Sequence, residues 1–221
     1  LRAEGADVRW IDADLRDRDS VESLVRRGGD GGLPIRGVVH AAAGIDDALL
    51  KDLDTERLRT PFAAKVTGAV HLAHALDPTH LDFLILCSAA GSLLDPGGQG
   101  NYAAANEALE ALGREMNRMG WPATSVAWGL WDRGMASGDD GRIARRWREM
   151  GLTAIDDETA PALLDAVLAA GESHVVAALV DRLALARNAH HLGPLVEGLG
   201  GARPAGGEQR PGAVADELRA L

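Results

Sequence analysis

Short apolar runs alternate with amphipathic stretches along most of this chain. The apolar runs predict strands over residues 7–13, 35–42, 81–87, 123–128 and 173–179. Between them, apolar residues recur every three or four positions and predict helices over residues 20–27, 50–76 with a break near Pro61, 102–119, 143–150 and 157–169. Strands that alternate with helices in this way are typical of an α/β fold, in which a parallel sheet has helices on both faces.

In such a sheet, ligands bind beyond the carboxyl ends of the strands. The residues that directly follow the predicted strands are therefore the candidate site residues. They are Asp14, the segment from Ala41 to Asp47, Ser88 and Gly129.

Composition narrows the classes of function. The 221 residues are 46% hydrophobic, which suits one folded domain plus an appendage. The net charge of -10 argues against nucleic-acid binding, because an acidic surface does not neutralise phosphates. A single cysteine, Cys87, excludes an internal disulfide, and the sequence shows no cluster of metal ligands, so we expect no metal. Without a signal peptide or an apolar run long enough to span a membrane, the sequence indicates a cytoplasmic protein outside the membrane.

The C-terminal part changes in character. Residues 198–212 are rich in Gly and Pro, which is typical of a flexible linker. We therefore expect a domain over residues 1–192 and a linker over residues 193–212. Residues 213–221 resume a helical pattern, which we interpret as the start of a helix that leads to another domain of a longer polypeptide.

Four polar residues lie where the predicted fold places them at one edge of the sheet. Ser88 ends a strand, Tyr102 and Asn106 are four residues apart on one helix face, and Lys65 lies on an earlier helix. Tyr102 is the only tyrosine, and Lys65 is one of only two lysines among 23 basic residues. Such a group suits proton delivery to a carbonyl, because a nearby ammonium lowers the pKa of a tyrosine and a serine hydroxyl stabilises charge on the oxygen.

Four segments of the sequence resemble the ketoreductase domains of modular polyketide synthases, in the short-chain dehydrogenase/reductase superfamily. The segments are residues 38–42 (Val-Val-His-Ala-Ala), 86–91 (Leu-Cys-Ser-Ala-Ala-Gly), 99–106 (Gln-Gly-Asn-Tyr-Ala-Ala-Ala-Asn) and 127–131 (Ala-Trp-Gly-Leu-Trp). The resemblance extends over roughly residues 1 to 190. It implies a Rossmann-like, doubly wound parallel sheet that is N-terminally truncated and followed by the Gly/Pro-rich linker.

The resemblance implies a reaction and its participants. NADPH would reduce a β-keto thioester, borne on the phosphopantetheine of an acyl carrier protein, to a β-hydroxy thioester. Tyr102 would donate the proton, Ser88 would polarise the ketone, and Lys65 and Asn106 would complete the relay. The cofactor would contact Asp14, Leu15, Ala41, Ala42, Ala43, Lys65, Tyr102, Trp128 and Gly129. The partners would be the acyl carrier protein, expected after the linker, and the neighbouring synthase domains.

The resemblance also bears on stereochemistry. Residues 45–47 (Ile-Asp-Asp) resemble the Leu-Asp-Asp motif of B-type reductases, which give D-configured alcohols, and Asn101 points the same way. Leu94 stands where A-type enzymes have a tryptophan. We therefore assign Asp47, Leu94 and Asn101 to control of stereochemistry, and Trp131 to the wall of the substrate entrance.

The sequence departs from the family pattern in two main places. The superfamily's Thr-Gly-x-x-x-Gly-x-Gly loop is absent, and Gly28 to Gly32 follow a predicted helix, so they form no phosphate cradle. We therefore expect this chain alone to bind NADPH weakly or not at all. Ser88 and Tyr102 are also one residue further apart than the family pattern implies, with the extra residue between Leu93 and Gly98.

Two alternatives to a ketoreductase remain at this point. A reductase-inactive domain that only organises its neighbours fits the missing loop, although the four catalytic residues speak against decay. A free-standing dehydrogenase is disfavoured by the linker and by the Trp-Gly-Leu-Trp segment. Epimerase activity at the α-carbon stays open.

Overall fold

A four-stranded parallel sheet forms the centre of the molecule. The computed structural model describes residues 5–29, 33–93, 98–132, 142–185 and 187. Its sheet has the order β1-β2-β3-β5, with β1 at Gly37–His40, β2 at Phe83–Ala89, β3 at Ala123–Trp128 and β5 at His174–Ala177. All three pairings are parallel, which confirms the predicted sheet.

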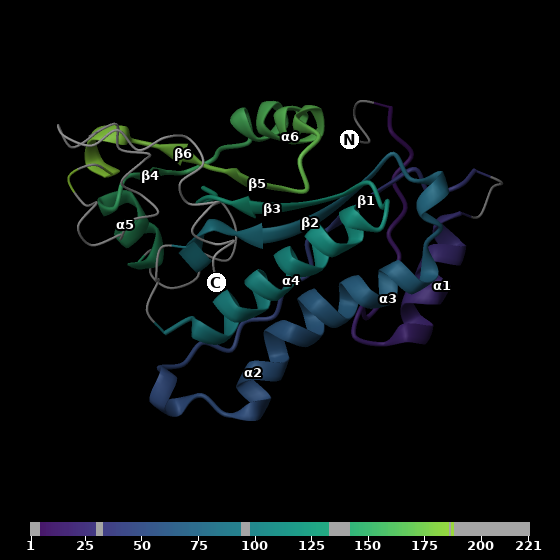
Figure 1. Ribbon diagram of the computed structural model, residues 1–221, viewed down its shortest axis with the longest axis horizontal. Helices are drawn as coiled ribbons and strands as arrows, with labels where there is room; N and C mark the ends of the chain where they lie inside the picture. Colours follow the sequence, from purple (N-terminus) through teal and green to yellow (C-terminus); the bar gives the residue numbers. More distant parts are fainter. Residues whose placement is uncertain (1–4, 30–32, 94–97, 133–141, 186, 188–221) are drawn as a thin grey trace, which may run out of the picture.

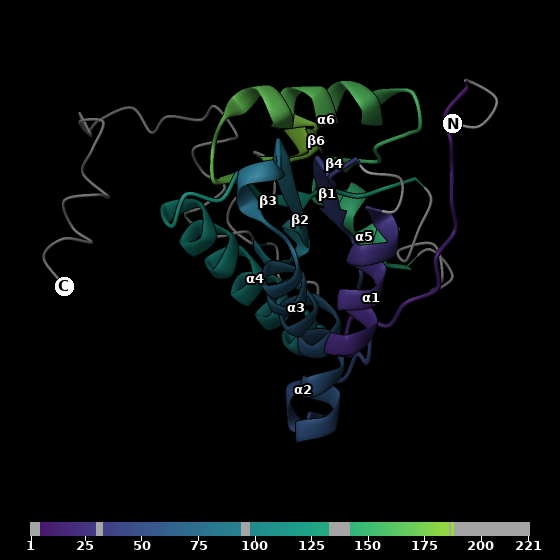
Figure 2. The same ribbon diagram turned by 90° about the vertical axis from the view of Figure 1, so that its right-hand side faces the viewer.

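Helices cover both faces of this sheet, as the sequence predicted. Helices α1 (Arg18–Gly28), α3 (Gly68–Ala75) and α4 (Gly100–Arg118) lie on one face, and α6 (Thr159–Ala170) lies on the other (Figures 1 and 2). Beyond the carboxyl ends of the strands lie α5 (Arg142–Glu149) and a small antiparallel sheet of β4 (Leu152–Thr153) and β6 (Leu179–Val180). Short helical segments occupy η2 (Leu50–Asp52), η4 (Pro78–His80) and η5 (Ala90–Leu93).

A hydrophobic core lies on each face of the main sheet. Strand β2 contributes to both cores because its side chains alternate between the two faces. Leu84 and Leu86 pack with Leu109 of α4 in the larger core. Ile85 packs on the opposite face with Val167 of α6. The same alternation places Ser88, two residues after Leu86, on the α4 side of the sheet.

The helix predicted over residues 50–76 is interrupted, and Pro61 explains where. Helix α2 (Thr55–Phe62) contains Pro61 and is followed by η3 (Ala63–Thr67), which is a turn of π-helix, and then by α3. Proline has no N–H to donate, so the carbonyl four residues earlier, that of Arg57, loses its helical partner. The side chain of Asn101 supplies the missing donor, with Nδ2 at 2.8 Å from that oxygen.

Two predicted strands differ from the structure. Residues 6–14 form no strand in the described structure, and Trp10 is 92% exposed. A short apolar run alone therefore does not decide whether a segment joins a sheet. The last predicted strand is divided into β5, which joins the main sheet, and β6, which pairs with β4. The predicted loop at residues 134–141 and the linker and terminal helix at residues 193–221 lie outside the described residues.

Helix α4 approaches the sheet closely at Gly113. A Cβ atom at this position would lie 3.1 Å from Ser125 Cβ of β3 and 3.2 Å from Leu86 Cδ1 of β2. Glycine therefore sets the distance between α4 and the strands, and with it the position of every side chain on the inner face of α4.

A larger side chain at Gly113 is expected to push α4 away from the sheet. Gly113→Leu should lower the free energy of unfolding by about 1–3 kcal/mol, because overpacking forces strained rotamers or backbone shifts. Ala111→Leu, at an exposed position of the same helix, is the matched control and should change stability little. Guanidinium unfolding followed by circular dichroism measures both, and equal stabilities of the two variants would contradict the close-packing argument.

Candidate active site

The predicted catalytic residues meet at the carboxyl ends of β1 and β2. Ser88 is the penultimate residue of β2, Lys65 comes from η3, and Tyr102 and Asn106 come from the first turns of α4. Lys65, Ser88 and Asn106 are buried, and Tyr102 is partly buried. Elements far apart in the sequence thus bring these four side chains to one edge of the sheet.

Lys65 is the most constrained of these residues. Its side chain is buried with only 3% of the residue exposed, and Nζ donates a hydrogen bond to the carbonyl of Cys87 at 2.9 Å. Nζ also lies over the ring of Tyr102, 5.2 Å from its centroid. Burial lowers the pKa of Lys65 to about 8, against the opposing attraction of the Cys87 and Glu110 side chains. His40 Nε2 lies 2.8 Å from the carbonyl oxygen of Lys65 and helps to hold this turn in place.

The pKa of Tyr102 moves in the direction opposite to the one we predicted from the sequence. Burial raises the pKa of Tyr102 above its usual value of 10.0, and the negative charges of Asp47 and Cys87 raise it further, while the neighbouring Asn106 amide works against them. The Lys65 ammonium lies over the ring face and hydrogen-bonds to a backbone carbonyl, and burial of the phenol is the largest cause of the shift. The Tyr102 hydroxyl therefore keeps its proton at neutral pH, as a proton donor must.

Ser88 has a partner that the sequence analysis missed. Its Oγ donates a hydrogen bond of 2.5 Å to Oε1 of Glu110, a carboxylate on α4 that is only 3% exposed. Glu110 lies four residues after Asn106 and eight after Tyr102, so the three residues share one helix face. The sequence did contain a signal for this role. Glu110 is an acidic residue at a position that the helical pattern places on the buried face, and charged side chains are rarely buried without a partner.

Asn106 is fully buried, and its side chain makes no hydrogen bond of good geometry within the described part of the chain, although its amide lies near enough to the Tyr102 hydroxyl to lower the pKa of Tyr102. A buried amide normally satisfies its donors and acceptors. The Asn106 amide therefore has hydrogen-bonding capacity left for a water or a ligand group, and its role in the relay stays a prediction.

The Asp46–Asp47 segment is tied to the start of α4. Asn101, only 1% exposed, donates from Nδ2 to the carbonyl of Asp46 at 2.8 Å as well as to that of Arg57. Gln99 Nε2 donates to Asp47 Oδ2 at 2.7 Å, and Arg57 pairs with Asp46 at 2.7 Å. Asp47 thus lies beside Tyr102, whereas Asn101 acts as an anchor between backbone segments. Arg57, a second residue that the sequence analysis missed, completes this anchor.

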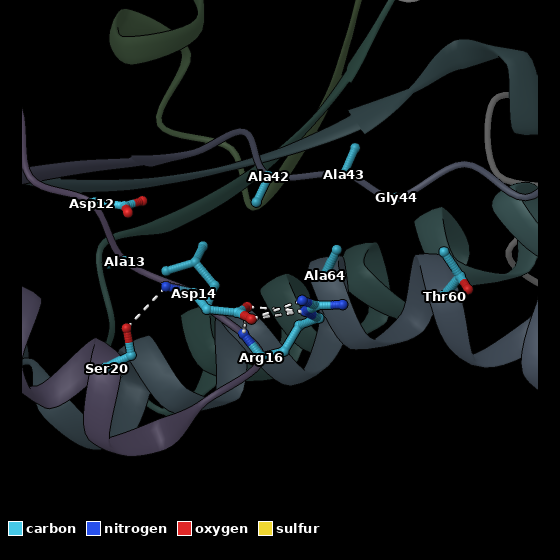
Figure 3. Close-up of a pocket in the computed structure, with 11 residues that line it drawn as sticks. Asp12, Ala13, Asp14, Arg16, Ser20, Ala42, Ala43, Gly44, Thr60 and Ala64 are labelled. Carbon is cyan, nitrogen blue, oxygen red and sulfur yellow. Dashed lines mark hydrogen bonds and ion pairs between the residues drawn. The ribbon is translucent and has the colours of Figure 1, made fainter.

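A pocket of about 510 Å³ lies next to this site. The predicted cofactor residues Asp14, Leu15, Ala42 and Ala43 line it, together with Gly44 and Ala64 (Figure 3). Asp14 accepts two-pronged hydrogen bonds from the side chain of Arg16, which is the main cause that lowers the pKa of Asp14 to about 2. Arg16 is the only basic residue among the described residues that line this pocket.

The remaining predicted residues lie around the edge of the site. Ala41 follows β1 but does not line the pocket, and Gly129 is explained by packing, since a Cβ there would lie 2.9 Å from Ala178 Cβ. Trp128 is packed in the core beneath α6, with its ring centroid 5.3 Å from that of the half-exposed Trp131. Leu94 lies outside the described residues.

Other classes of site find no support in the described part of the chain. No group of three or more His, Cys, Asp or Glu residues there is placed to hold a metal ion. None of the helices described combines the length and apolar character that crossing a bilayer requires. Burial raises the pKa of the Cys87 thiol, which makes it a poor nucleophile.

The chain is similar to known synthases and reductases. The family model described as "KR domain" matches residues 1–133. The phenolphthiocerol synthesis polyketide synthase type I Pks15/1 of Mycobacterium marinum is 40% identical over 171 residues, which are 76% of this chain and 8% of that protein. The polyketide synthase GfsA of Streptomyces halstedii is 42% identical over 174 residues, 78% of this chain and 2% of that protein.

A solved structure described as an A1-type ketoreductase superposes with a TM-score of 0.75 at 31% identity, over 84% of this chain and 39% of that one. The chain therefore spans less than a tenth of the two synthases and about two fifths of the solved ketoreductase. These similarities confirm the Rossmann-like α/β fold that the sequence predicted.

The raised pKa of Tyr102 is open to a direct titration. Because Tyr102 is the only tyrosine, tyrosinate absorbance reports it alone, and we expect a midpoint above 10 in the folded chain. Asp47→Asn should lower this midpoint by removing a negative charge, and unfolding should return it to about 10. A midpoint at or below 10 in the folded chain would refute the effect of burial.

The lowered pKa of Lys65 should appear as a pH dependence of stability. Between about pH 8 and pH 10.5 the unfolded chain still binds the proton that folded Lys65 has released, so the free energy of unfolding should rise with pH. The rise attributable to Lys65 should reach at most about 3 kcal/mol.

The difference between the unfolding curves of the wild type and Lys65→Met across this pH range measures that rise. Lys51→Met, which removes the only other lysine at an exposed position, is the control and should leave the wild-type rise intact. The same rise in Lys65→Met as in the wild type would show that Lys65 titrates normally.

Proposed function

The chain belongs to the KR domain family of modular polyketide synthases, and from this membership we propose that it reduces a β-keto thioester carried on an acyl carrier protein to a β-hydroxy thioester, with NADPH as reductant. KR domains are oxidoreductases that use a nicotinamide cofactor. The carrier protein, the choice of NADPH and the D configuration of the alcohol are parts of the proposal. Its partners are the carrier protein and the neighbouring domains of the synthase.

One observation carries the proposal. Lys65 lies under the ring of Tyr102 and donates to the carbonyl of Cys87, the residue next to Ser88. Lys65 thus contacts both the ring of the protonated Tyr102 and the backbone next to the Ser88 hydroxyl. This is the set of groups that proton delivery to a ketone requires.

The roles of the residues follow from their chemistry. Ser88 hydrogen-bonds to the ketone oxygen, and Tyr102 donates its proton to that oxygen as negative charge develops there. Lys65 stabilises the phenolate that remains, and Asn106 holds the water through which Tyr102 regains a proton. A nicotinamide cofactor bound in the adjacent pocket would supply the hydride for the carbonyl carbon. The carbon–oxygen double bond becomes a single bond, and the thioester is unchanged.

The pocket beside the site fits part of the cofactor. The small side chains of Ala13, Ala42 and Ala43 leave room for a flat ligand, and Gly44 allows the chain to pass close to the carbonyl of Thr60. Asp14 and Leu15 would contact the adenine end, and Arg16, the only basic residue among the described residues that line the pocket, would be available to a phosphate. No Gly-rich loop is present in the sequence for the pyrophosphate, so we propose that this chain alone binds the cofactor weakly.

Substrate control is proposed for the residues around Tyr102. Asp47 lies close enough to influence the charge of Tyr102, so it is placed to contact a substrate there. Asn101 would act indirectly, by fixing the backbone of Asp46. Trp131, with its exposed ring against Trp128, would form a wall of the entrance.

The test is NADPH oxidation with a simple β-keto thioester. It compares this chain with an extended polypeptide, in which the same residues follow a Gly-rich cofactor-binding segment. We expect turnover in the extended polypeptide only, with a preference for NADPH over NADH and a loss of about 1,000-fold or more in Tyr102→Phe, since no other group replaces the proton donor.

Two outcomes would overturn parts of this proposal. No turnover in either polypeptide would favour a reductase-inactive domain that organises its neighbours. Turnover by the present chain alone would show that the cofactor binds without the Gly-rich loop. The configuration of the alcohol product, determined by chiral chromatography, decides the stereochemical assignment.

A further inference from the structure

The interaction between Ser88 and Glu110 is the shortest side-chain hydrogen bond in the buried site. Ser88 Oγ lies 2.5 Å from Glu110 Oε1, and both residues are buried. The two come from different elements, Ser88 from the end of β2 and Glu110 from the inner face of α4. A serine hydroxyl rotates freely unless a partner fixes it, so Glu110 determines where the Ser88 proton points.

Among the residues that the structure describes, no cationic side chain lies within hydrogen-bond distance of the Glu110 carboxylate. Arg114 Nη1 lies 3.9 Å and His174 Nδ1 lies 3.7 Å from Oε2, both beyond hydrogen-bond distance. His174 Nδ1 is instead 3.0 Å from Ser125 Oγ, and the ammonium of Lys65 acts on Glu110 only through its charge. Ser88 is therefore the main hydrogen-bond partner of the Glu110 carboxylate among the described residues.

This arrangement has a chemical consequence for Ser88. The hydroxyl has one proton and two lone pairs. While it donates to Glu110, it has no proton to offer a ketone oxygen. To polarise a ketone, Ser88 must turn its O–H toward the substrate, and Glu110 must then be satisfied by Arg114 or His174, each a small side-chain movement away.

We propose that Glu110 is a positioning residue that acts through Ser88, by fixing its oxygen at the end of β2 and by controlling the transfer of its hydrogen bond to the ketone. The inference rests on the proposed ketoreductase function, in which Ser88 contacts the substrate. Glu110 itself touches no reacting atom. Its effect should therefore appear in the chemical step and vanish when Ser88 has no hydroxyl.

The experiment is a double-mutant cycle in the extended polypeptide. Ser88→Ala should lower kcat by about 100-fold, as the loss of one donor to a developing oxyanion does. Glu110→Leu, which keeps the approximate shape, should lower kcat by about tenfold with little change in KM, because it removes only the anchor of that donor. In the Ser88→Ala background, Glu110→Leu should change kcat by less than about twofold.

Two variants guard against a purely structural explanation. Glu110→Gln, whose amide can still hydrogen-bond to Oγ, should restore most of the activity lost in Glu110→Leu. Glu107→Leu, at an exposed position of the same helix, makes the same chemical change and should leave kcat unchanged. Replacement of a buried charge by an apolar residue is often tolerated in folding, and the unfolding midpoint checks this for Glu110→Leu.

The outcomes separate the inference from the function on which it rests. Equal losses from Glu110→Leu with and without the Ser88 hydroxyl, or no loss at all, would overturn the inference while the reductase activity stands. A wild type without turnover would remove the proposed function. Crystal structures of the wild type and Glu110→Leu then still test the anchor, since Ser88 Oγ should occupy one position in the wild type and move or split without Glu110. A wild-type Oγ away from Glu110 would refute the anchor itself.

Discussion

The close approach of helix α4 to strands β2 and β3 governs the arrangement of the site. Gly113 permits this approach, because any side chain there would meet Ser125 and Leu86. Tyr102, Asn106 and Glu110 lie on the same helix face, toward its N-terminus, and so their distances from Ser88 are set by the packing at Gly113. A helix displaced outward would separate the carboxylate from the hydroxyl and the phenol from the ammonium together.

Burial shapes the charges of this site more than pairing does. The ammonium of Lys65 has one backbone carbonyl and the ring face of Tyr102 as partners, and neither supplies a negative charge. Burial lowers the pKa of Lys65 and raises the pKa of Tyr102 in the same surroundings. Both shifts favour the neutral form of the group, so the site holds a protonated phenol beside a lysine that gives up its own proton near pH 8.

Because Pro61 has no N–H, the carbonyl of Arg57 is free to accept a hydrogen bond from Asn101. Asn101 in turn joins helix α2 to the Asp46–Asp47 segment. The carbonyl of Arg57 accepts from Asn101 in place of the proline, and the second amide hydrogen of Asn101 holds the carbonyl of Asp46. The π-helical turn that follows Pro61 contains Lys65. One local departure from a regular helix thereby positions both the ammonium and the Asp46–Asp47 segment. Such π-helical turns are frequent at functional sites.

The sequence by itself determined the alternation of strands and helices, the parallel sheet and the edge at which Lys65, Ser88, Tyr102 and Asn106 meet. The elements follow from hydrophobic periodicity, which is a local property of the chain. The common edge follows from the rule that the loops after parallel strands lie at one end of the sheet. The segments of residues 86–91 and 99–106 also predicted the family, because each motif is a continuous run of residues that can be recognised in the sequence.

Only the tertiary structure decided the electrostatics and the strand partners. The direction of the Tyr102 pKa shift depends chiefly on how far the phenol is buried, and that burial is set by residues far away in the sequence. Glu110 became a partner of Ser88 only when α4 packed on β2, and residues 6–14 form no strand in the described structure despite their apolar pattern. Burial and pairing are properties of contacts between distant segments, whereas periodicity is a property of the chain itself.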